Sequence, residues 1–343
     1  MEHSKISLTS SEIAAIWTAY MNDSMAVCVL SHMIKYMEDE DLKGPVQTSL
    51  SMAKKHVEEL KQYFQKENLA TPVGFTEDDV DLDAPQLSTD TFGLTYVTQM
   101  ARVGMVAYSG YVSTSVRADI RNHFIEGLRE TSLLYDEAIQ VALEKGILGR
   151  APYIETTKEI DFIDNKSYLS GLGIFKQKRP LNAVEISHLY LNSMTNSVGV
   201  KLCIAFAQTT NNPEVRDYML KGGKEIAKKH LKKFAETLLD GDIETPHLPD
   251  YAIMNSTTPT FSDKLLMFQM SLLSAAGIGN YSTAASASQR SDLVLSYEKL
   301  SMEIALFAKK GLDIMIKNNW LEQPPGTLDR NKISKKSTNQ PSN

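Results

Sequence analysis

The chain has 343 residues and a formal net charge of −6, with 42% hydrophobic and 23% charged residues. This length is enough for about two domains, and the composition is typical of soluble globular proteins. The acidic balance lacks the concentrated basic face of a general nucleic-acid binder, so we expect no nucleic-acid partner. Two cysteines are too few for a disulfide framework, and they favour a reducing compartment.

The N-terminus shows neither the basic start nor the long apolar run of a secretion signal. No stretch of about 18 consecutive apolar residues is present, so we expect no membrane span. Together these features predict a protein that is cytoplasmic when it is made.

The sequence contains a duplication. The segment around Glu12 returns around Glu185, a shift of 173 (185 − 12), and Ala-Lys-Lys-His56 returns as Ala-Lys-Lys-His230, a shift of 174 (230 − 56). Polar residues kept in both copies therefore become the first candidates for function. Further matched pairs are Thr71-Pro72 and Thr245-Pro246, Tyr108 and Tyr281, Arg117-x-Asp119 and Arg290-x-Asp292, Glu130 and Glu303, and Ile147-Leu148 and Trp320-Leu321.

Apolar residues recur at helical spacing, which predicts four helices in each copy. Thr9 stands three residues before Glu12, and Asn182 stands three before Glu185. This is the spacing of a capping box, and we prefer that interpretation of both glutamates to a metal-ligand role. The expected helices cover about residues 10–38, 44–68, 90–114 and 117–146, then a helix from Asn182, and about 213–240, 262–288 and 291–320.

A connection of about 18 residues follows the second helix of each copy, which is long for a helical bundle. It is long enough to run from one end of a bundle to the other, as in the ferritin-like arrangement. A plain up-and-down bundle is the alternative topology. The predicted fold is all-α, with two tandem ferritin-like four-helix bundles at residues 8–150 and 179–322, a linker at 151–178 and a disordered tail at 323–343.

One histidine and one glutamate are matched between the copies in the middle of their helices. His56 and His230 lie about halfway along the second helices, and Glu130 and Glu303 lie about 13 residues into the fourth. At about 1.5 Å of rise per residue, all four reach a similar height, so we expect each pair to meet in its core. These four residues are the candidate metal ligands.

A complete di-iron site is not expected, because such sites take a Glu-x-x-His motif from each of two helices and neither copy has one there. Two interpretations stay open. Each pair either satisfies itself by hydrogen bonding without a cofactor, or it holds a single Fe, Mn or Zn ion or a small ligand.

The other helices supply neighbours for these pairs. The first helix has Asp23 in one copy and Asn196 in the other, at a similar level. The third helices are rich in small residues and carry Tyr108 and Tyr281, whose hydroxyls could point into the same space. A third interpretation is therefore a pocket for an apolar ligand beside either tyrosine. The sequence has no glycine-rich phosphate loop, nucleophile elbow, His-Glu-x-x-His or Cys-x-x-Cys motif, so we lean against an enzyme.

The order of these motifs resembles a known family. The Leu-Thr-x-x-Glu-Ile opening at residues 8–13, the Ala-Lys-Lys-His56 segment and Thr71-Pro72 all occur twice. They resemble a two-repeat ferritin-like family from endospore-forming bacteria that is related to the spore coat F-type domain. The resemblance spans residues 8 to about 325 and transfers no catalytic residues.

The resemblance implies a sporulation protein made in the cytoplasm, with the spore as a further location. We therefore predict a non-catalytic structural or interaction protein of the spore coat, which associates with protein partners or with itself. The alternative is a degenerate ferritin-like protein that binds a metal or small ligand through the His–Glu pair of each repeat.

Overall fold

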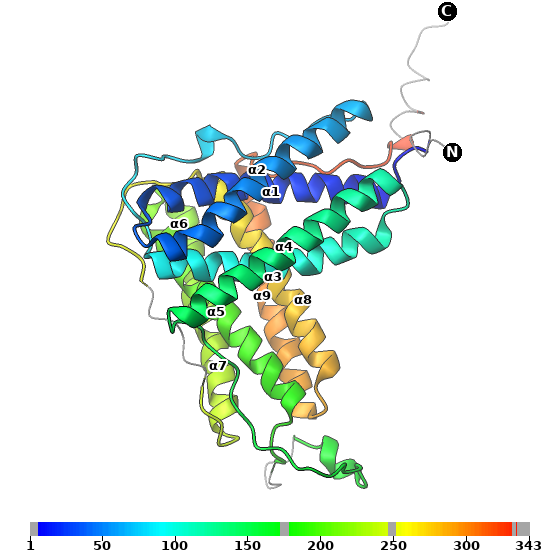
Figure 1. The fold of residues 1–343 in the computed structure, drawn as a ribbon, viewed down its shortest axis with the longest axis vertical. Coiled ribbons are helices and arrows are strands. Elements are labelled where there is room, and N and C mark those ends of the chain that lie inside the picture. Colours follow the sequence, from blue (N-terminus) through cyan, green and yellow to red (C-terminus); the bar gives the residue numbers. More distant parts are fainter. Residues whose placement is uncertain (1–5, 172–177, 246–251, 331–333, 335–343) are drawn as a thin grey trace, which may run out of the picture.

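A computed structural model describes residues 6–171, 178–245, 252–330 and 334, and almost all of its regular structure is helical (Figure 1). Each copy of the duplication forms one group of long helices, here called the first and the second repeat. The first repeat contains α1 (Ser10–Tyr36), α2 (Glu40–Lys66), α3 (Asp90–Thr114) and α4 (Ala118–Glu144). The second contains α5 (Ala183–Thr209), α6 (Pro213–Lys221), the π-helical segment η4 (Gly222–Ala227), α7 (Lys228–Leu239), α8 (Asp263–Ala287) and α9 (Ser291–Lys317).

Both predicted capping boxes are present. The Thr9 hydroxyl accepts from the Glu12 amide, and the Glu12 carboxylate accepts from the Thr9 amide at 2.7 Å. The same carboxylate also accepts from the Arg117 amide at 2.6 Å, so the cap joins the start of α1 to the start of α4. Glu185 repeats this arrangement with Asn182 and with the Arg290 amide. The glutamates are structural, as predicted.

The start of α2 differs from the prediction. We expected a helix from about residue 44 and assigned the acidic residues before it to a turn. The helix instead begins at Glu40, because the Asp39 side chain caps it by accepting from the amides of Asp41 and Leu42. Acidic residues in a first turn are also favoured by the helix dipole.

The π-helical segment explains why the shift between the copies changes from 173 to 174. The caps Asp39 and Asn212 are 173 residues apart, whereas His56 and His230 are 174 apart. Segment η4 lies between Asn212 and His230, and a π turn accommodates one extra residue without ending a helix. The insertion therefore leaves His230 facing the core, as His56 does.

The long connection of each repeat joins opposite ends of its helices. The Asp90 carboxylate accepts from the amides of Glu38 and Asp39, which places the start of α3 at the turn between α1 and α2. Glu67, directly after α2, pairs with Arg117 at the other end. Helices α2 and α3 therefore run parallel. In the second repeat, Thr210 and Asp263 bring the start of α8 to the end of α5 in the same way. The up-and-down alternative does not describe either repeat.

The two long connections pair with each other in a symmetric way. Antiparallel bridges join Val80 to Phe261 and Ser88 to Ile253. Ile253 is the counterpart of Val80 and Phe261 is the counterpart of Ser88, each at a shift of 173. Each repeat thus uses the same segment to contact the other, as in an isologous interface between two subunits.

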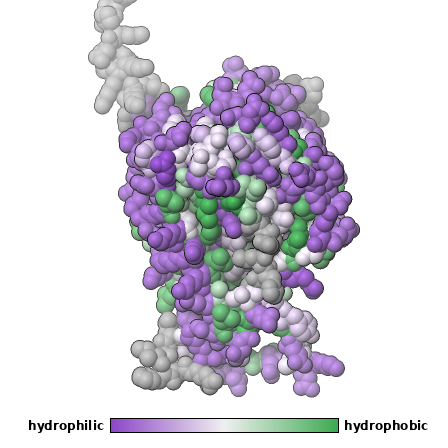
Figure 2. Space-filling view, turned by 90° about the vertical axis from the view of Figure 1, so that its left-hand side faces the viewer, coloured by the Kyte–Doolittle hydropathy of each residue, from purple (hydrophilic) through white to green (hydrophobic). Residues whose placement is uncertain are grey.

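The repeats also share a hydrophobic core. One cluster of buried residues extends from Met25 and Val46 in the first repeat to Phe206 and Met315 in the second. Two smaller clusters fill the far ends of the repeats. The helices of the first repeat lie across the top of Figure 1, and those of the second extend below them. Figure 2 shows one face on which hydrophilic residues dominate and hydrophobic ones gather in narrow strips.

Helix α1 is long and apolar enough to cross a bilayer by length and composition. In the structure, 56% of its most apolar window is buried against the other helices. The absence of a membrane span therefore stays a prediction.

The linker and the C-terminal tail were assigned by sequence to residues 151–178 and 323–343. The described linker residues are mostly exposed, and residues 172–177 lie outside the described part. Residues 323–330 are exposed, and the rest of the predicted tail lies outside the described residues except for Ser334. Just before the tail, Glu322 accepts from the amides of Val73 and Gly74 and so ties this segment to the first repeat.

Candidate functional site

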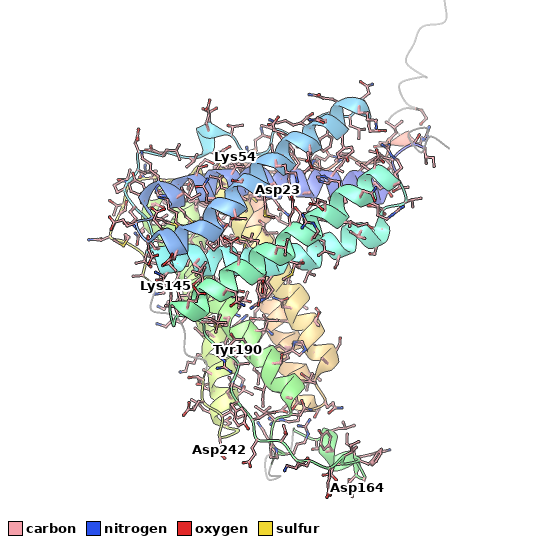
Figure 3. The ribbon with its side chains drawn as sticks, in the orientation of Figure 1. Asp23, Lys54, Lys145, Asp164, Tyr190 and Asp242 are labelled. Atoms are coloured by element: carbon pink, nitrogen blue, oxygen red, sulfur yellow. The ribbon has the colours of Figure 1, made fainter. Side chains whose placement is uncertain are left out.

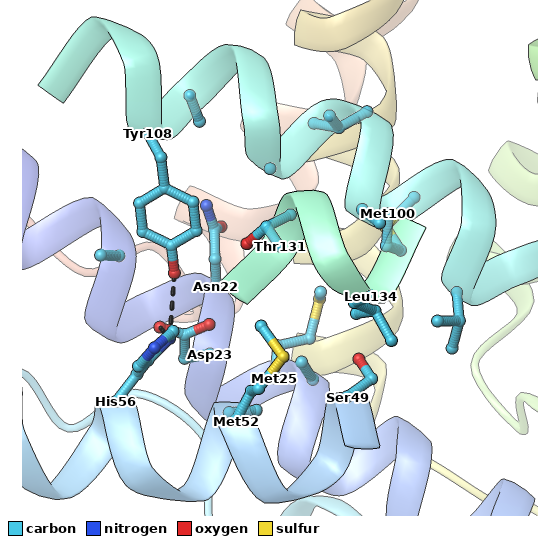
Figure 4. A pocket seen from close by; sticks show the side chains of 18 of the residues that line it. Asn22, Asp23, Met25, Ser49, Met52, His56, Met100, Tyr108, Thr131 and Leu134 are labelled. Carbon is cyan, nitrogen blue, oxygen red and sulfur yellow. Dashed lines mark hydrogen bonds and ion pairs between the residues drawn. The ribbon is translucent and has the colours of Figure 1, made fainter. Parts of the chain in front are cut away.

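The predicted histidine and glutamate of the first repeat meet inside the bundle. His56 on α2 is buried, and its Nε2 lies 2.9 Å from the Glu130 carboxylate on α4. Because a carboxylate only accepts, Nε2 carries the proton of this bond. Its Nδ1 lies 3.1 Å from the Tyr108 hydroxyl on α3 (Figure 4). The other oxygen of Glu130 accepts from Lys55 at 2.6 Å.

The second repeat builds the same chain of groups. His230 Nε2 lies 3.1 Å from Glu303, and its Nδ1 lies 3.1 Å from the Tyr281 hydroxyl. Lys229 donates to Glu303 at 2.7 Å. The Asn196 amide on α5 then donates to the Tyr281 hydroxyl at 2.8 Å. Each polar group in this chain therefore has a hydrogen-bonding partner.

The first helix makes the two repeats differ. Asp23 on α1 stands where the second repeat has Asn196 (Figure 3). The Asp23 Oδ2 lies 3.6 Å from His56 Nδ1, which is an ion-pair distance but too long for a hydrogen bond. This oxygen is buried, and it has no hydrogen-bond donor within the described part of the chain.

The exchange of Asp23 for Asn196 shifts the pKa values of the two histidines in opposite directions. Burial lowers the pKa of His56, but the carboxylates of Asp23 and Glu130 outweigh burial and raise the pKa to about 9. In the second repeat, burial lowers the pKa of His230 below 6.5, because Glu303 alone opposes it. His56 is therefore an imidazolium at neutral pH, while His230 is neutral.

A cavity of about 130 Å³ lies beside His56 in the first repeat (Figure 4). Asp23, His56 and Tyr108 form its polar end. The rest of its wall is mostly apolar and includes Met25, Met52, Met100 and Leu134 from the first repeat and Leu272 from α8 of the second. The predicted space beside the third helix is therefore present in this repeat.

The corresponding space in the second repeat is about 60 Å³. Phe307 stands at the position of Leu134, and its ring stacks on Tyr218 with centroids 4.1 Å apart. Ile304 likewise stands at the position of Thr131, so two lining side chains are larger in the second repeat. The two repeats thus share the hydrogen-bonded chain but not the cavity.

The four candidate metal ligands lie in two separate His–Glu pairs, one in each repeat. Among the described residues, no group of three or more His, Cys, Asp or Glu side chains is arranged to hold a metal ion. Each His–Glu pair is close, but a lysine ammonium occupies the same glutamate. Metal binding by His56, Glu130, His230 and Glu303 stays a prediction.

One pair beside the site was missed by the sequence analysis. His123 on α4 lies 3.0 Å from Glu59 on α2, and its ring is 5.7 Å from the His56 ring. The second repeat has Ser296 and Lys233 at these positions. A search for residues kept in both copies cannot find such a pair. Burial and the charge of His56 lower the pKa of His123.

The fold and the site together define a class of two-repeat helical protein with one buried polar chain in each repeat. Residues 1–160 and 170–333 both match the family described as "Protein of unknown function (DUF3231)". The chain belongs to this family and contains two copies of its domain.

No protein of curated function matches the chain. Among solved structures, the chain is similar to a "putative spore coat protein" from Bacillus halodurans C-125 at 17% sequence identity. The match covers 45% of this chain and 100% of that one, with a TM-score of 0.41.

Proposed function

We propose that the protein is a non-enzymatic binding protein with two ferritin-like repeats, and that the first repeat holds a small molecule in the cavity beside His56. The second repeat serves as a structural scaffold. The observation that carries this proposal is the difference between the repeats at matched positions. The cavity measures about 130 Å³ where Leu134 lines it and about 60 Å³ where Phe307 fills it.

The ferritin-like assignment is part of this proposal. It is supported by the parallel course of α2 and α3 and by the long connection that joins the opposite ends of each repeat. That topology is one of the known forms of four-helix bundle with a single crossover. Cytoplasmic synthesis is a proposal drawn from the cysteine content and the N-terminal sequence. A place in the spore coat and protein partners are proposals drawn from the sequence resemblance.

A cavity next to a buried acceptor without a donor, Asp23 Oδ2, is a cost to the fold unless something occupies it. Filling the space would need few changes, because the second repeat has larger side chains at two lining positions, Phe307 for Leu134 and Ile304 for Thr131. Lining the space with three methionines makes it adaptable, since unbranched thioethers adjust to different shapes. These features favour a binding pocket over a packing defect.

The metal alternative has less support from the geometry. A metal at His56 would compete with the hydrogen bonds from Nε2 to Glu130 and between Nδ1 and Tyr108. It would also compete with Lys55 for Glu130. The single Fe, Mn or Zn ion per repeat is therefore kept as an outcome to be measured.

The proposal is tested by NMR of the full-length protein with ¹³C-labelled methionine methyl groups, titrated with toluene. We expect toluene to shift the signals of Met25, Met52 and Met100, which line the cavity. Leu134→Phe should abolish these shifts, whereas the volume-conserving Leu134→Met should retain them. Absence of any shift at the three methionines in a folded wild-type protein would overturn the proposal.

A further inference from the structure

The cavity also indicates the chemical class of its ligand, an inference that rests on the proposed function. We infer that the ligand is a small neutral molecule, with an apolar body of about one aromatic ring and one hydroxyl or N–H group that donates to Asp23.

The donor follows from the unused acceptor at the polar end of the cavity. Asp23 lines the cavity, and its Oδ2 is buried without a hydrogen bond in the part of the chain that the structure describes. A buried acceptor left without a donor is costly to the fold. His56 Nδ1 is 3.6 Å away and already contacts the Tyr108 hydroxyl, so a ligand donor is the missing partner.

The neutral charge follows from the groups around the cavity. Asp23 and the His56 imidazolium form an ion pair, so their charges balance at the polar end. Glu130 contacts His56 Nε2, and its negative charge is balanced by an ion pair with Lys55. A cationic ligand would be repelled by His56, and an anionic ligand would be repelled by Asp23. Neither would find an unpaired group of opposite charge. Burying an unpaired charge in such a place is strongly unfavourable.

The size and the apolar body follow from the volume and the wall. A cavity of about 150 Å³ in another protein binds benzene, so about 130 Å³ suits a single ring or a short branched chain. The three methionine side chains offer favourable sulfur contacts to an aromatic ring.

The way in lies between α1 and α3. Here the lining residues are small and partly exposed: Ala26 on α1, and Gly104 and Ala107 on α3. Small side chains cover little of the cavity at this point, which leaves it partly open to solvent. A compact ligand can therefore enter without unfolding a helix.

The second repeat serves as an internal comparison. Asn196 replaces Asp23, and its amide already donates to Tyr281, so this position presents no buried carboxylate to a ligand. The smaller cavity also leaves no room for a ring. We therefore expect one ligand for each chain, bound in the first repeat.

The test compares phenol with toluene, which have nearly the same shape but differ in one donor. Binding to the full-length protein is measured by the methionine-methyl titration. We expect phenol to bind about tenfold more tightly than toluene, as a hydrogen bond to a charged group predicts. Asp23→Asn should remove most of this preference. Asp136→Asn, which changes an exposed carboxylate on α4, should leave it intact.

The outcomes separate this inference from the function it rests on. Equal affinity for phenol and toluene, or a preference for phenol that survives Asp23→Asn, would overturn the assigned ligand class and leave the binding function standing. Tighter binding of benzylamine or benzoate than of phenol would overturn the neutral charge. If neither phenol nor toluene binds the wild-type protein, the proposed function itself fails.

Discussion

The exchange of Asp23 and Asn196 should exchange the charge states of the two histidines. Asp23→Asn removes one of the two carboxylates that raise the pKa of His56. The variant then has the same first-helix amide, glutamate, lysine and tyrosine around His56 as the second repeat has around His230. The remaining differences are the His123–Glu59 pair, Tyr111 and Glu126, where the second repeat has Ser296, Lys233, Ala284 and Lys299. We therefore expect the pKa of His56 to fall from about 9 to near or below 6.5, as is the case for His230.

The magnitude follows from linkage between protonation and folding. The folded-state pKa of His56 is about 9 and its ordinary value is 6.5. This difference corresponds to about 3 kcal/mol, at about 1.4 kcal/mol for each pH unit. Because the folded pKa is raised, this stabilisation is complete below pH 6.5 and is lost as the pH rises through 9. In Asp23→Asn, this fall in unfolding free energy between pH 6.5 and 9 should largely disappear.

The assay has two parts. Two-dimensional NMR of the imidazole groups gives the pKa of each histidine, and urea unfolding at several pH values gives the free energy. Other polar and charged groups face His56 from α2, α3 and α4 and are kept unchanged: Lys55, Glu59, Tyr108, Tyr111, His123, Glu126 and Glu130. Tyrosine and lysine titrate above the pH range used.

The matched variant is Asn196→Asp in the second repeat, which should raise the pKa of His230 above 6.5. A His56 pKa that stays near 9 in Asp23→Asn would refute the reasoning. So would a His230 pKa that does not move in Asn196→Asp, provided that both variants keep the wild-type helical circular dichroism.

Four further predictions follow from the structure. Glu12→Gln should lower the unfolding free energy by about 1–3 kcal/mol, because the buried carboxylate accepts from several donors at the start of α1 and α4; Glu185→Gln should act in the same direction, and unchanged urea midpoints would contradict this. Phe307→Ala should lower the unfolding free energy by about 3–5 kcal/mol in the same urea assay. The milder Phe307→Leu should enlarge the second-repeat space enough to admit toluene, and NMR shifts at Met270 would report the binding. Because the repeats share one core, calorimetry should show a single unfolding transition, and two well-separated transitions would count against the shared core. Metal analysis of protein purified without chelator should find no stoichiometric Fe, Mn or Zn; an equivalent that disappears in the double variant His56→Ala plus His230→Ala would support the metal alternative instead.

Much of the helical framework could be predicted from the sequence because its signals are local. The spacing of Thr9 and Glu12 identifies a capping box, since the two residues contact each other within one turn. That His56 and Glu130 lie at the same height in the bundle follows from the rise per residue of their helices. The start of α2 was predicted less well, because the same acidic residues can form a turn or cap a helix.

The cavity could not be predicted in the same way, because it depends on packing between helices. Leu134 and Phe307 both fit an apolar helical pattern, and only the packed structure shows that one leaves a space and the other fills it. Comparison of the two sequence copies selects residues that both copies share. The candidate site instead depends on Asp23, a position at which the second copy has Asn196.

The pairing of the repeats was also beyond the sequence signals. Val80 and Phe261 bridge two irregular connections, which carry no periodic pattern. The extra residue in η4 was visible only as a change of shift from 173 to 174, with no indication that a π turn accommodates it.

The most direct test of the central claim is a crystal structure of the full-length protein soaked with phenol. We predict one ring in the first repeat among Met25, Met52 and Met100, with its hydroxyl within hydrogen-bond distance of Asp23 Oδ2. The corresponding space beside Tyr281 in the second repeat should contain no ring. An empty first-repeat cavity, or a ring bound equally in both repeats, would contradict the account.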